Sequence, residues 1–401
     1  MTYLSELSQA ESLRQAFSHV SKGRIGRPAG LVQGVDGISI NSFAENIDSK
    51  LLSIAEKLRN KSYKFSQLKP IILHDPIKNK KRIICIPTVS DRIVQRAILN
   101  RIANSQPWLF NEVSYGFIPR TDEKKGVIAA VKKAKELRNQ FPWIFKTDIQ
   151  KFFDRVNRPL LEEEVRKKIR QHSVHNLLRQ AMHCEIKLGS RSESAQIKQA
   201  GIKFGEGVRQ GMPLSPFFAN LMLSDFDKYC IKSNIKAIRY ADDLIFFCQS
   251  ESQAVSIYGE CKEKLSKFEL SIPEIEINSK SAIASPEESA SFLGVELSPN
   301  GNNSYVLRVG KKQIEDIKSN FYSLCNISEL KAKNLNLGKL QVALESKKDA
   351  YSACYEYCDN IQDLDTQMED WVNGVMKRAL NNVGISVTAL NRDARWLLGF
   401  R

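Results

Sequence analysis

The sequence lacks a hydrophobic run long enough to cross a membrane. A spanning helix needs roughly 20 consecutive, mostly apolar residues, and none of the 401-residue chain reads that way. The N-terminal segment, MTYLSELSQAESLRQAF, is polar and periodic and has no apolar core of the kind found in secretory signal peptides. We therefore expect no membrane association and a cytoplasmic location.

Clustered cysteines are missing as well. The eight cysteines are scattered, and the closest pair, Cys354 and Cys358, is one helical turn apart in a stretch with helical apolar spacing. A structural zinc site would need further clustered ligands, and a disulfide framework is typical of small secreted domains. Buried thiols in a reducing cytoplasm explain these cysteines best.

Acidic residues are in deficit. The chain has 60 Lys and Arg against 45 Asp and Glu, a formal net charge of +15. Such an excess favours a polyanionic partner, of which nucleic acid is the most common, although many basic proteins bind none. Hydrophobic residues make up 42% of the chain, which is enough to bury a sizeable core and excludes wholesale disorder.

Strand and helix patterns alternate through the middle of the chain. Short apolar runs predict a hairpin over 69–87, a strand over 143–149, a hairpin over 238–247 and single strands over 274–284 and 292–297. Apolar residues at helical spacing predict helices over 42–60, 126–139, 158–170, 216–232 and 253–268, and an almost wholly helical segment after 311. The polar segment 186–204 is expected to form a flexible hairpin. The order β-α-β-β-α-β in the middle predicts a ferredoxin-like α+β arrangement.

Two adjacent carboxylates interrupt one of the most apolar stretches of the chain, RYADDLIFF at 239–247. A turn at Asp242 and Asp243 between two strands would place both side chains at a hairpin tip, where they could hold a hard divalent cation through oxygen ligands. A plain exposed turn is the alternative, because Asp is common in turns. Asp148 in FKTDIQKFFD, at the end of another apolar strand, would complete a cage of three carboxylates for two metal ions.

A rigid turn comes before the helix expected over 216–232. In GVRQGMPLSP at 207–216, Gly211 and Pro213 shape the chain where the helix starts. Small residues there would let a base pair approach the backbone closely. As an isolated Gly/Pro turn, the segment would be unremarkable.

Taken together, these segments resemble the motifs of reverse transcriptases. YADD at 240–243 resembles the catalytic box, FKTDIQKFFD at 145–154 the first carboxylate motif, and RQGMPLSPFFANLML at 209–223 the motif that grips the template. Further segments resemble the bacterial branch that includes group II intron enzymes: GVDGIS at 34–39, KKRIICIPTVSDRIVQRAI at 80–98, SYGFIPRTDEKKGV at 114–127 and, as a primer grip, SFLGVEL at 291–297. All seven stand in the family's order, over roughly residues 34–300.

The resemblance implies a right-hand polymerase with fingers, a ferredoxin-like palm and a helical thumb. It implies an N-terminal helical extension at 1–33, fingers and palm at 34–304, and a thumb at 305–401. The implied activity is RNA-directed DNA synthesis from dNTPs with two Mg²⁺ ions, which Mn²⁺ can replace. The implied metal ligands are Asp148, Ile149, Asp242 and Asp243.

Other roles carry over residue by residue. Lys280 is implied as a proton donor near the pyrophosphate, and Arg82 as the finger arginine on the triphosphate. Phe153 matches the aromatic residue that excludes a 2′-OH, although it or Phe152 must also face inward. Nucleotide contacts are further implied for Ile149 and Gln210, and contacts to nucleic acid for Arg209, Gly211, Pro213, Tyr240, Leu293 and Gly294. Lys280 and Arg82 would otherwise be ordinary surface cations.

The sequence departs from the intron enzymes before the finger turn. Those enzymes carry a lysine where Asp75-Pro76-Ile77 stands here, so Lys78 or Lys80 would have to replace it. No Cys/His endonuclease cluster follows the palm. A short palm with a helical thumb resembles the bacterial "unknown group" and abortive-infection enzymes, which implies antiphage defence, a structured non-coding RNA as template and an oligomer or effector protein as partner. The alternatives are a maturase-like RNA-binding splicing cofactor with little polymerisation, and a template-independent nucleotidyl polymerase.

Overall fold

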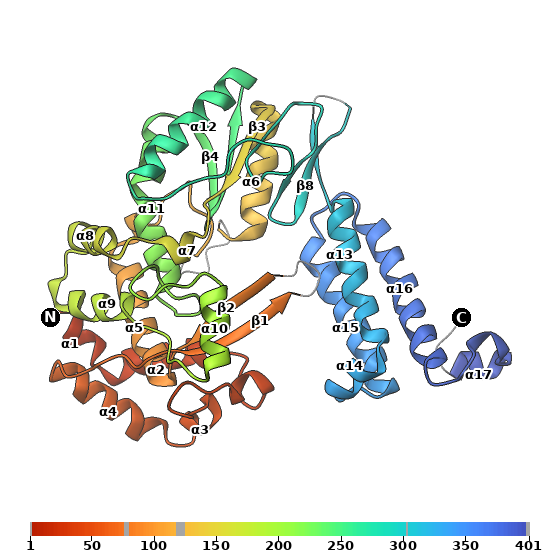
Figure 1. Ribbon diagram of the computed structural model, residues 1–401, viewed down its shortest axis with the longest axis horizontal. Coiled ribbons are helices and arrows are strands. Elements are labelled where there is room, and N and C mark those ends of the chain that lie inside the picture. The colour runs from red at the N-terminus through yellow and green to blue at the C-terminus, as the bar shows by residue number, and fades with distance from the viewer. Residues whose placement is uncertain (1, 76–79, 118–124, 302–303, 398–401) are drawn as a thin grey trace. The chain divides into compact units, whose positions relative to one another are not determined.

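A computed structural model describes residues 2–75, 80–117, 125–301 and 304–397. The chain forms two compact units, traced in Figure 1. Unit 1 consists of Met1–Ala130 and Phe145–Ile283, and unit 2 of Val131–Ile144 and Ala284–Arg401. The domain boundaries expected at 33 and 304 stay predictions. Within the described ranges, no helix is both long and apolar enough to cross a membrane.

The N-terminal part of unit 1 is a helical layer. The helix α2 (Ala10–Ser21) packs along α5 (Val89–Ser105), and α1 (Tyr3–Leu7), α3 (Ile40–Ala44) and α4 (Ile47–Arg59) complete the layer. The single helix expected over 42–60 was wrong, because the chain breaks at Asn46, which has a non-helical backbone and begins α4 as its N-cap. Asn competes for backbone hydrogen bonds and therefore favours helix ends over helix interiors.

The centre of unit 1 is a four-stranded sheet in the order β4-β5-β3-β6. Its strands are β3 (Trp143–Asp148), β4 (Lys236–Tyr240), β5 (Asp243–Cys248) and β6 (Ala282–Ala284). The helices α11 (Ser215–Lys232) and α12 (Glu251–Ser266) pack against β4 and β5. The chain order β3, helices, β4, β5, α12, β6 confirms the predicted β-α-β-β-α-β arrangement.

The strand predicted over 274–284 was mostly wrong. Only its end, β6, pairs within the sheet. The alternation of Ile and Glu over 274–277 reads as a half-buried strand, but Ile277 is 95% exposed. Asn278 then takes a left-handed backbone (φ 64°), a conformation that Asn tolerates and that ends an extended segment.

A two-stranded hairpin, β1 (Lys69–Asp75) with β2 (Lys80–Ile86), confirms the hairpin expected over 69–87. The segment 186–204, expected to be a flexible hairpin, instead contains the helix α10 (Arg191–Gln199). The Ser190 side chain accepts a hydrogen bond from the Glu193 amide at 3.2 Å, the arrangement that starts a helix at Ser-x-x-Glu. Ile197 buries the inner face of α10 against the hairpin.

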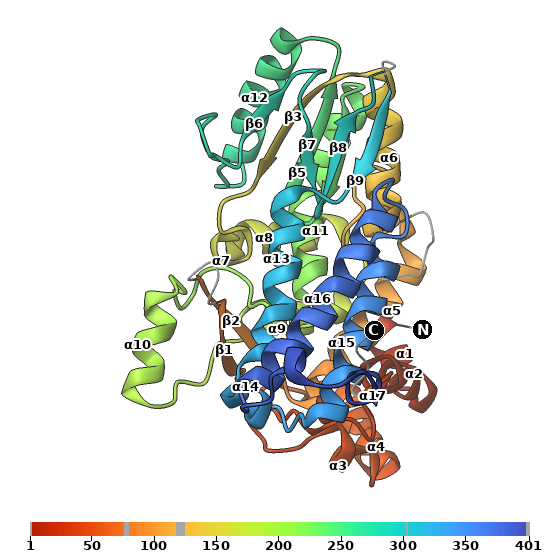
Figure 2. The same cartoon turned by 90° about the vertical axis from the view of Figure 1, so that its right-hand side faces the viewer.

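Unit 2 combines a small sheet with a helical layer. The sheet is β7 (Ala290–Phe292), β8 (Val295–Pro299) and β9 (Tyr305–Arg308). The single strand expected over 292–297 was wrong, since Leu293 and Gly294, both with positive φ, form a tight turn between β7 and β8. The long helices α13 (Lys311–Tyr322), α15 (Leu337–Tyr355) and α16 (Ile361–Asn381) lie side by side in Figure 2 and confirm the helical tail.

Shorter helices connect these elements. In unit 1 they are α7 (Phe152–Arg155), α8 (Arg158–Lys168) and α9 (His175–Met182). The helix α6 (Val127–Gln140), most of which belongs to unit 2, precedes β3 in the chain. In unit 2 they are α14 (Ile327–Ala332) and α17 (Arg392–Leu397).

Candidate active site

Two carboxylates lie at the tip of the β4–β5 hairpin. Tyr240 pairs with Asp243, so Ala241 and Asp242 alone form the turn. Ala241 takes a left-handed backbone (φ 60°), an unusual conformation for a residue with a side chain. The hairpin forms because the flanking strands are apolar and buried, and the carboxylates lie at the first position where the chain can leave the core.

Asp148 ends β3 beside this turn. The Ile149 amide donates a hydrogen bond to the Asp242 carbonyl at 3.0 Å, which joins the end of β3 to the turn. Asp148 is only 7% exposed, and its Oδ2 accepts a hydrogen bond from the Lys280 ammonium. No described residue forms a hydrogen bond with its Oδ1. Lys280 reaches this position because the neighbouring Ser281 hydroxyl bonds the Thr147 hydroxyl at 2.7 Å.

The three carboxylates act on one another electrostatically. Partial desolvation raises the pKa of Asp243 to about 6, and the charges of Asp242 and Asp148 act in the same direction. Burial also raises the pKa of Asp242; the charge of Asp148 adds to this, whereas Lys280 and Arg82 oppose it. Negative charge is therefore concentrated here without full compensation, a condition that favours cation binding.

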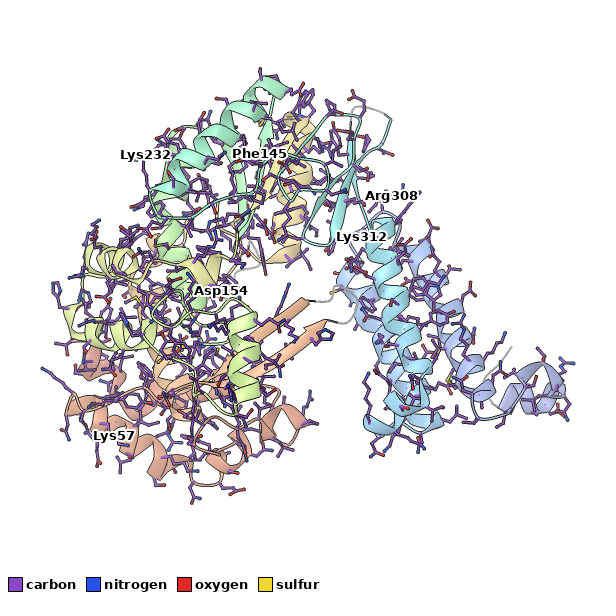
Figure 3. The ribbon with its side chains drawn as sticks, in the orientation of Figure 1. Lys57, Phe145, Asp154, Lys232, Arg308 and Lys312 are labelled. Atoms are coloured by element: carbon purple, nitrogen blue, oxygen red, sulfur yellow. The ribbon has the colours of Figure 1, made fainter. Side chains whose placement is uncertain are left out.

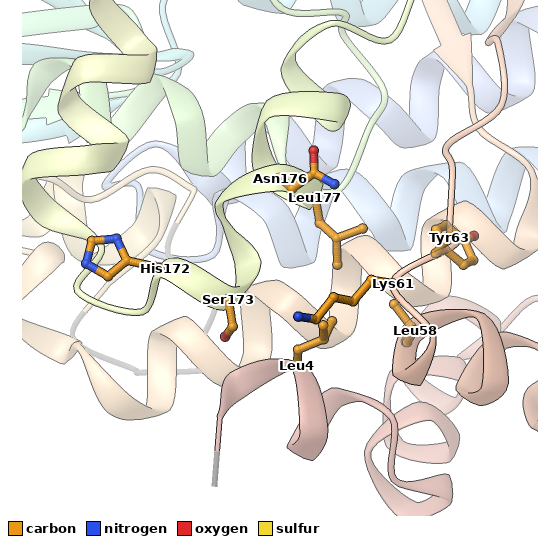
Figure 4. A pocket seen from close by; sticks show the side chains of 8 residues that line it. All are labelled: Leu4, Leu58, Lys61, Tyr63, His172, Ser173, Asn176 and Leu177. Atoms are coloured by element: carbon orange, nitrogen blue, oxygen red, sulfur yellow. The ribbon is translucent and has the colours of Figure 1, made fainter.

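These groups line one cavity of about 490 Å³. Figure 3 labels Asp154, which lies on its wall. Eight residues that the sequence singled out share this cavity: Arg82, Asp148, Ile149, Phe153, Gln210, Asp242, Asp243 and Lys280. A second cavity, of about 200 Å³, is shown in Figure 4; its lining includes Leu4, Lys61 and His172 but no Asp or Glu. The three carboxylates therefore make the cavity of about 490 Å³ the candidate active site.

Of the two adjacent rings, Phe152 faces the core and Phe153 faces the cavity. Phe152 is 1% exposed and belongs to the core. Phe153 is half-buried, lines the cavity and meets Phe117 edge-on with ring centroids 5.8 Å apart. The ambiguity that the sequence left between the two rings is resolved in favour of Phe153 as the ring at the cavity.

Gln210 is held by the β1–β2 hairpin. Its carbonyl accepts a hydrogen bond from the Cys85 amide at 2.7 Å. The next residue, Gly211, has φ 106°, and an added Cβ would lie 2.4 Å from the Cys85 carbonyl oxygen. Only glycine permits this approach, so the backbone beside Gln210 and the strand that carries Arg82 are in direct contact.

Comparison with known protein families identifies the family of this chain. Residues 67–297, more than half of the chain, match the family described as "Reverse transcriptase (RNA-dependent DNA polymerase)". The chain belongs to the reverse transcriptase family. All eight residues named above for the cavity around Asp148 lie within the matched range.

The individual proteins to which the chain is similar share 30% or less of their aligned residues with it. Protein YkfC of Escherichia coli K12 is 30% identical over 207 residues, 49% of each chain. The group II intron-encoded protein LtrA of Lactococcus lactis is 24% identical over 53% of this chain and 33% of its own. The chain thus spans half or less of these curated relatives. Among solved structures, a Candida albicans telomerase aligns over 90% of this chain and 68% of its own chain, with a TM-score of 0.45 and 11% identity. A partial Cas6-RT-Cas1–Cas2 complex aligns over 67% of this chain and 42% of its own, with a TM-score of 0.35 and 21% identity.

The motif arginine of this reverse transcriptase, Arg209, is buried and committed to a carboxylate. Its guanidinium pairs with Glu185 at 2.6 Å and donates to the Lys203 carbonyl at 2.7 Å. Arg158 pairs with the same Glu185 at 2.8 Å. In the structure, Arg209 therefore stabilises the segment next to Gln210 through these contacts. Its expected contact with nucleic acid stays a prediction.

The remaining expected residues lie outside the cavity lining. Tyr240 and Pro213 are half-buried in unit 1, and Leu293 and Gly294 form the β7–β8 turn of unit 2. Their contacts with nucleic acid stay predictions. The side chain of Lys80, and Lys78 altogether, lie outside the described residues.

Sequence reasoning missed a buried network behind the catalytic turn. Arg239 pairs with Asp227 through two hydrogen bonds of 2.7 and 2.5 Å, donates to Asn220 at 2.9 Å and reaches the Ala241 carbonyl at 3.2 Å. Asn220 and Asp227 lie seven residues apart on α11, hence on one face of an otherwise apolar helix. That polar pair was the signal in the sequence. Gly116 also contributes, because a Cβ there would lie 2.7 Å from the Ala241 amide.

The donor set fits a hard divalent cation. Among the described residues, no three Asp, Glu, His or Cys side chains already converge as a metal cluster. The Oδ1 of Asp148, without a partner among the described residues, and the raised pKa values of Asp242 and Asp243 are nevertheless what a cation would relieve. Lys280 supplies positive charge to Asp148 in this arrangement. Carboxylate oxygens are the ligands that magnesium and manganese prefer.

Proposed function

We propose that this protein is an RNA-directed DNA polymerase that adds dNTPs to a primer in the cavity around Asp148. One observation carries the proposal: the three carboxylates, Arg82, Phe153 and Gln210 line a single cavity, although they come from segments far apart in the chain. Family membership supports the same reaction. The whole protein's substrates and partners remain part of the proposal.

Each side chain has a distinct task in this reaction. Asp148, Asp242 and Asp243, with the Ile149 carbonyl, would hold two Mg²⁺ or Mn²⁺ ions. Such a pair stabilises the attacking and leaving oxygens of an in-line phosphoryl displacement. Arg82 binds the triphosphate of the incoming nucleotide, because a guanidinium matches phosphate oxygens with several donors. Lys280 supplies a proton near the pyrophosphate.

Phe153 and Gln210 select the nucleotide. The Phe153 ring lies on the cavity wall five residues after Asp148, at a position beneath the sugar if the triphosphate is bound at the carboxylates. A rigid ring there accepts a 2′-hydrogen and collides with a 2′-OH. Gln210 contacts the same sugar from the loop that Gly211 fixes against β2.

For the template we propose RNA, specifically a structured non-coding RNA, with the enzyme acting in antiphage defence in the cytoplasm. The net charge of +15 suits an RNA–DNA duplex, which proteins contact mainly through phosphates, 2′-OH groups and shape. The resemblance to abortive-infection enzymes supports the defence role and an oligomer or effector partner. The free cysteines, seven of the eight at least partly buried, fit a reducing compartment.

Primer extension on RNA and DNA templates, with and without template, tests the reaction. We expect wild-type protein to extend a DNA primer on RNA with dNTPs and Mg²⁺, and Asp242→Asn to abolish extension while keeping its melting temperature. Asp370→Asn, on the exposed side of α16, is the matched control and should extend normally. Full extension by a well-folded double Asn variant at 242 and 243 would refute the assignment. Extension without template would instead indicate an untemplated polymerase.

A further inference from the structure

Five arginines are buried in the described part of the chain, and one of them differs from the rest. Arg138 donates to three backbone carbonyls at 2.6–3.0 Å, while Arg158, Arg209 and Arg239 each pair with a carboxylate. Arg92, only 7% exposed, forms no ion pair with any described residue, and its Nε and Nη2 have no hydrogen-bond acceptor. Burying a charged group without partners is costly, so an anionic ligand would stabilise Arg92, whereas the other four arginines already have carbonyl or carboxylate partners.

Two more arginines lie near Arg92. Arg96 follows it by one turn on α5, is half-buried, and has an unpartnered Nε. The charge of Arg24 acts on both: desolvation, and then Arg24, lower the pKa of Arg92 to about 10 and lower the pKa of Arg96. Among the described acidic residues, Asp36 is the one whose charge acts on the pKa of Arg92, and it lies beyond ion-pair distance. The cluster of Arg24, Arg92 and Arg96 therefore carries uncompensated positive charge.

The cluster is presented by a fixed backbone. Arg24 belongs to the exposed segment KGRIGR, residues 22–27, which follows α2. An added Cβ at Gly30 would lie 2.3 Å from the Arg24 carbonyl oxygen, so the segment is pressed against the chain that follows it. The Gly26 amide also donates to the Asn41 side chain at 3.2 Å. Since α2 and α5 pack side by side (Figure 2), the segment and the two α5 arginines lie on one part of unit 1.

We propose that Arg24, Arg92 and Arg96 form a binding site for a backbone phosphate of the bound nucleic acid, separate from the catalytic cavity. A phosphodiester accepts hydrogen bonds from several guanidinium groups at once. The exposed basic segment 22–27 favours an extended polyanion that continues past the site over a free phosphate. This inference rests on the proposed function only in taking nucleic acid as the ligand. It makes no use of the reaction at Asp148.

Arg92→Met in the full-length protein separates a ligand-binding arginine from a structural one. Methionine keeps much of the volume and removes a desolvated charge. We therefore expect Arg92→Met to keep or raise the melting temperature without nucleic acid, whereas Arg138→Met, which removes a satisfied buried arginine, lowers it. If both variants lose stability alike, Arg92 is structural and the proposal is overturned.

Binding is measured with a labelled RNA template annealed to a DNA primer, over a series of salt concentrations. We expect Arg92→Met to weaken binding by roughly tenfold or more, the effect of losing charged hydrogen bonds. The slope of log affinity against log salt should fall by about 0.7–0.9, the value for one phosphate contact. Unchanged affinity and slope would refute the site.

Two further measurements distinguish a free phosphate ion from a backbone phosphate, and the phosphate site from the proposed polymerase activity. If inorganic phosphate raises the melting temperature of wild type but not of Arg92→Met, while both bind nucleic acid equally, the ligand is a free anion and the strand contact is refuted. Asp370→Asn, the exposed control on α16, should bind nucleic acid like wild type. If wild-type protein incorporates no dNTP yet shows the Arg92-dependent binding, the polymerase proposal fails and the phosphate site stands.

Discussion

Arg239 and Asp227 form an ion pair with two hydrogen bonds beside the β4–β5 turn, and their side chains are only 1% and 0% exposed. Asp227 also accepts from Asn111 at 2.8 Å. The pair joins helix α11 to strand β4 at the residue before Tyr240. The position of Asp242 therefore depends on a buried charge pair that does not line the cavity.

Breaking this pair should be strongly destabilising. Asp227→Asn leaves the Arg239 guanidinium buried without its counter-charge, a change that typically costs about 3–5 kcal/mol. We expect a lower urea midpoint and loss of dNTP incorporation at temperatures where wild type is active. The double variant Asp227→Leu with Arg239→Met should recover much of the stability, because no unpaired charge remains. A single variant as stable as wild type would contradict this account.

The ion pairs of Glu185 with Arg209 and Arg158 predict a pH dependence of stability. Burial alone would raise the pKa of Glu185, but the Gly205 amide, Arg209 and Arg158 lower it below its ordinary value of 4.5. A lowered pKa in the folded state gives stability that is fully present above 4.5 and is lost as the pH falls through the folded value.

Glu185→Gln tests that dependence. We expect its melting temperature to lie below that of wild type at neutral pH, and the difference to shrink as the pH falls below 4.5. Thermal melts across this range measure it, with the exposed Glu287→Gln as control. If the difference in melting temperature between Glu185→Gln and wild type stays constant with pH, the charge of Glu185 does not stabilise the folded protein.

The cavity position of Phe153 predicts sugar selection. Phe153→Val should raise incorporation of rNTPs relative to dNTPs, because forcing an extra atom into a packed site costs about 1–3 kcal/mol, equivalent to roughly five- to a hundredfold. Phe152→Val, in the core, should lower the melting temperature and leave the ratio unchanged. Steady-state incorporation of both nucleotide types by the folded variants decides. Equal ratios in Phe153→Val and wild type would assign Phe153 to packing alone.

Lys280 should have opposite effects on metal binding and on turnover. In the protein without substrate, its ammonium pairs with Asp148 Oδ2, so Lys280→Met should bind Mn²⁺ more tightly. The same variant should incorporate dNTPs about 10²–10⁴-fold more slowly, the range for losing a general acid. Calorimetric titration and single-turnover kinetics measure the two effects, with the exposed Lys312→Met as control. Unchanged kinetics would make Lys280 a surface cation.

The sequence was sufficient to predict the central fold and the cavity residues. Asp148 and Asp242 stand where apolar runs end, so their strands and the turn follow from local patterning. The order of these strands and helices along the chain is then enough to predict the α+β arrangement of the palm. The hairpin of β1 and β2 was equally readable, because β-rich runs flank a polar turn.

What the sequence did not predict depends on contacts across long separations. Glu185 directly precedes the segment expected to form a flexible hairpin, and nothing local shows that it meets Arg209 and Arg158. Arg92 reads as an ordinary helix residue, because its lack of partners exists only once α2 and α5 have packed. The helix α10 was a different kind of miss, since the Ser190 and Glu193 cap was legible in the sequence.

The contact between Gly211 and Cys85 has a consequence for nucleotide selection. Arg82 and Cys85 belong to the same strand, and Cys85 is hydrogen-bonded to the backbone of Gln210. A swing of the β1–β2 hairpin that brings Arg82 onto a triphosphate must therefore carry Gln210 along. Binding of the triphosphate and discrimination between the two sugars would then occur in one movement. Substitutions in β2 that speed nucleotide binding would therefore also change how well the enzyme discriminates between dNTPs and rNTPs.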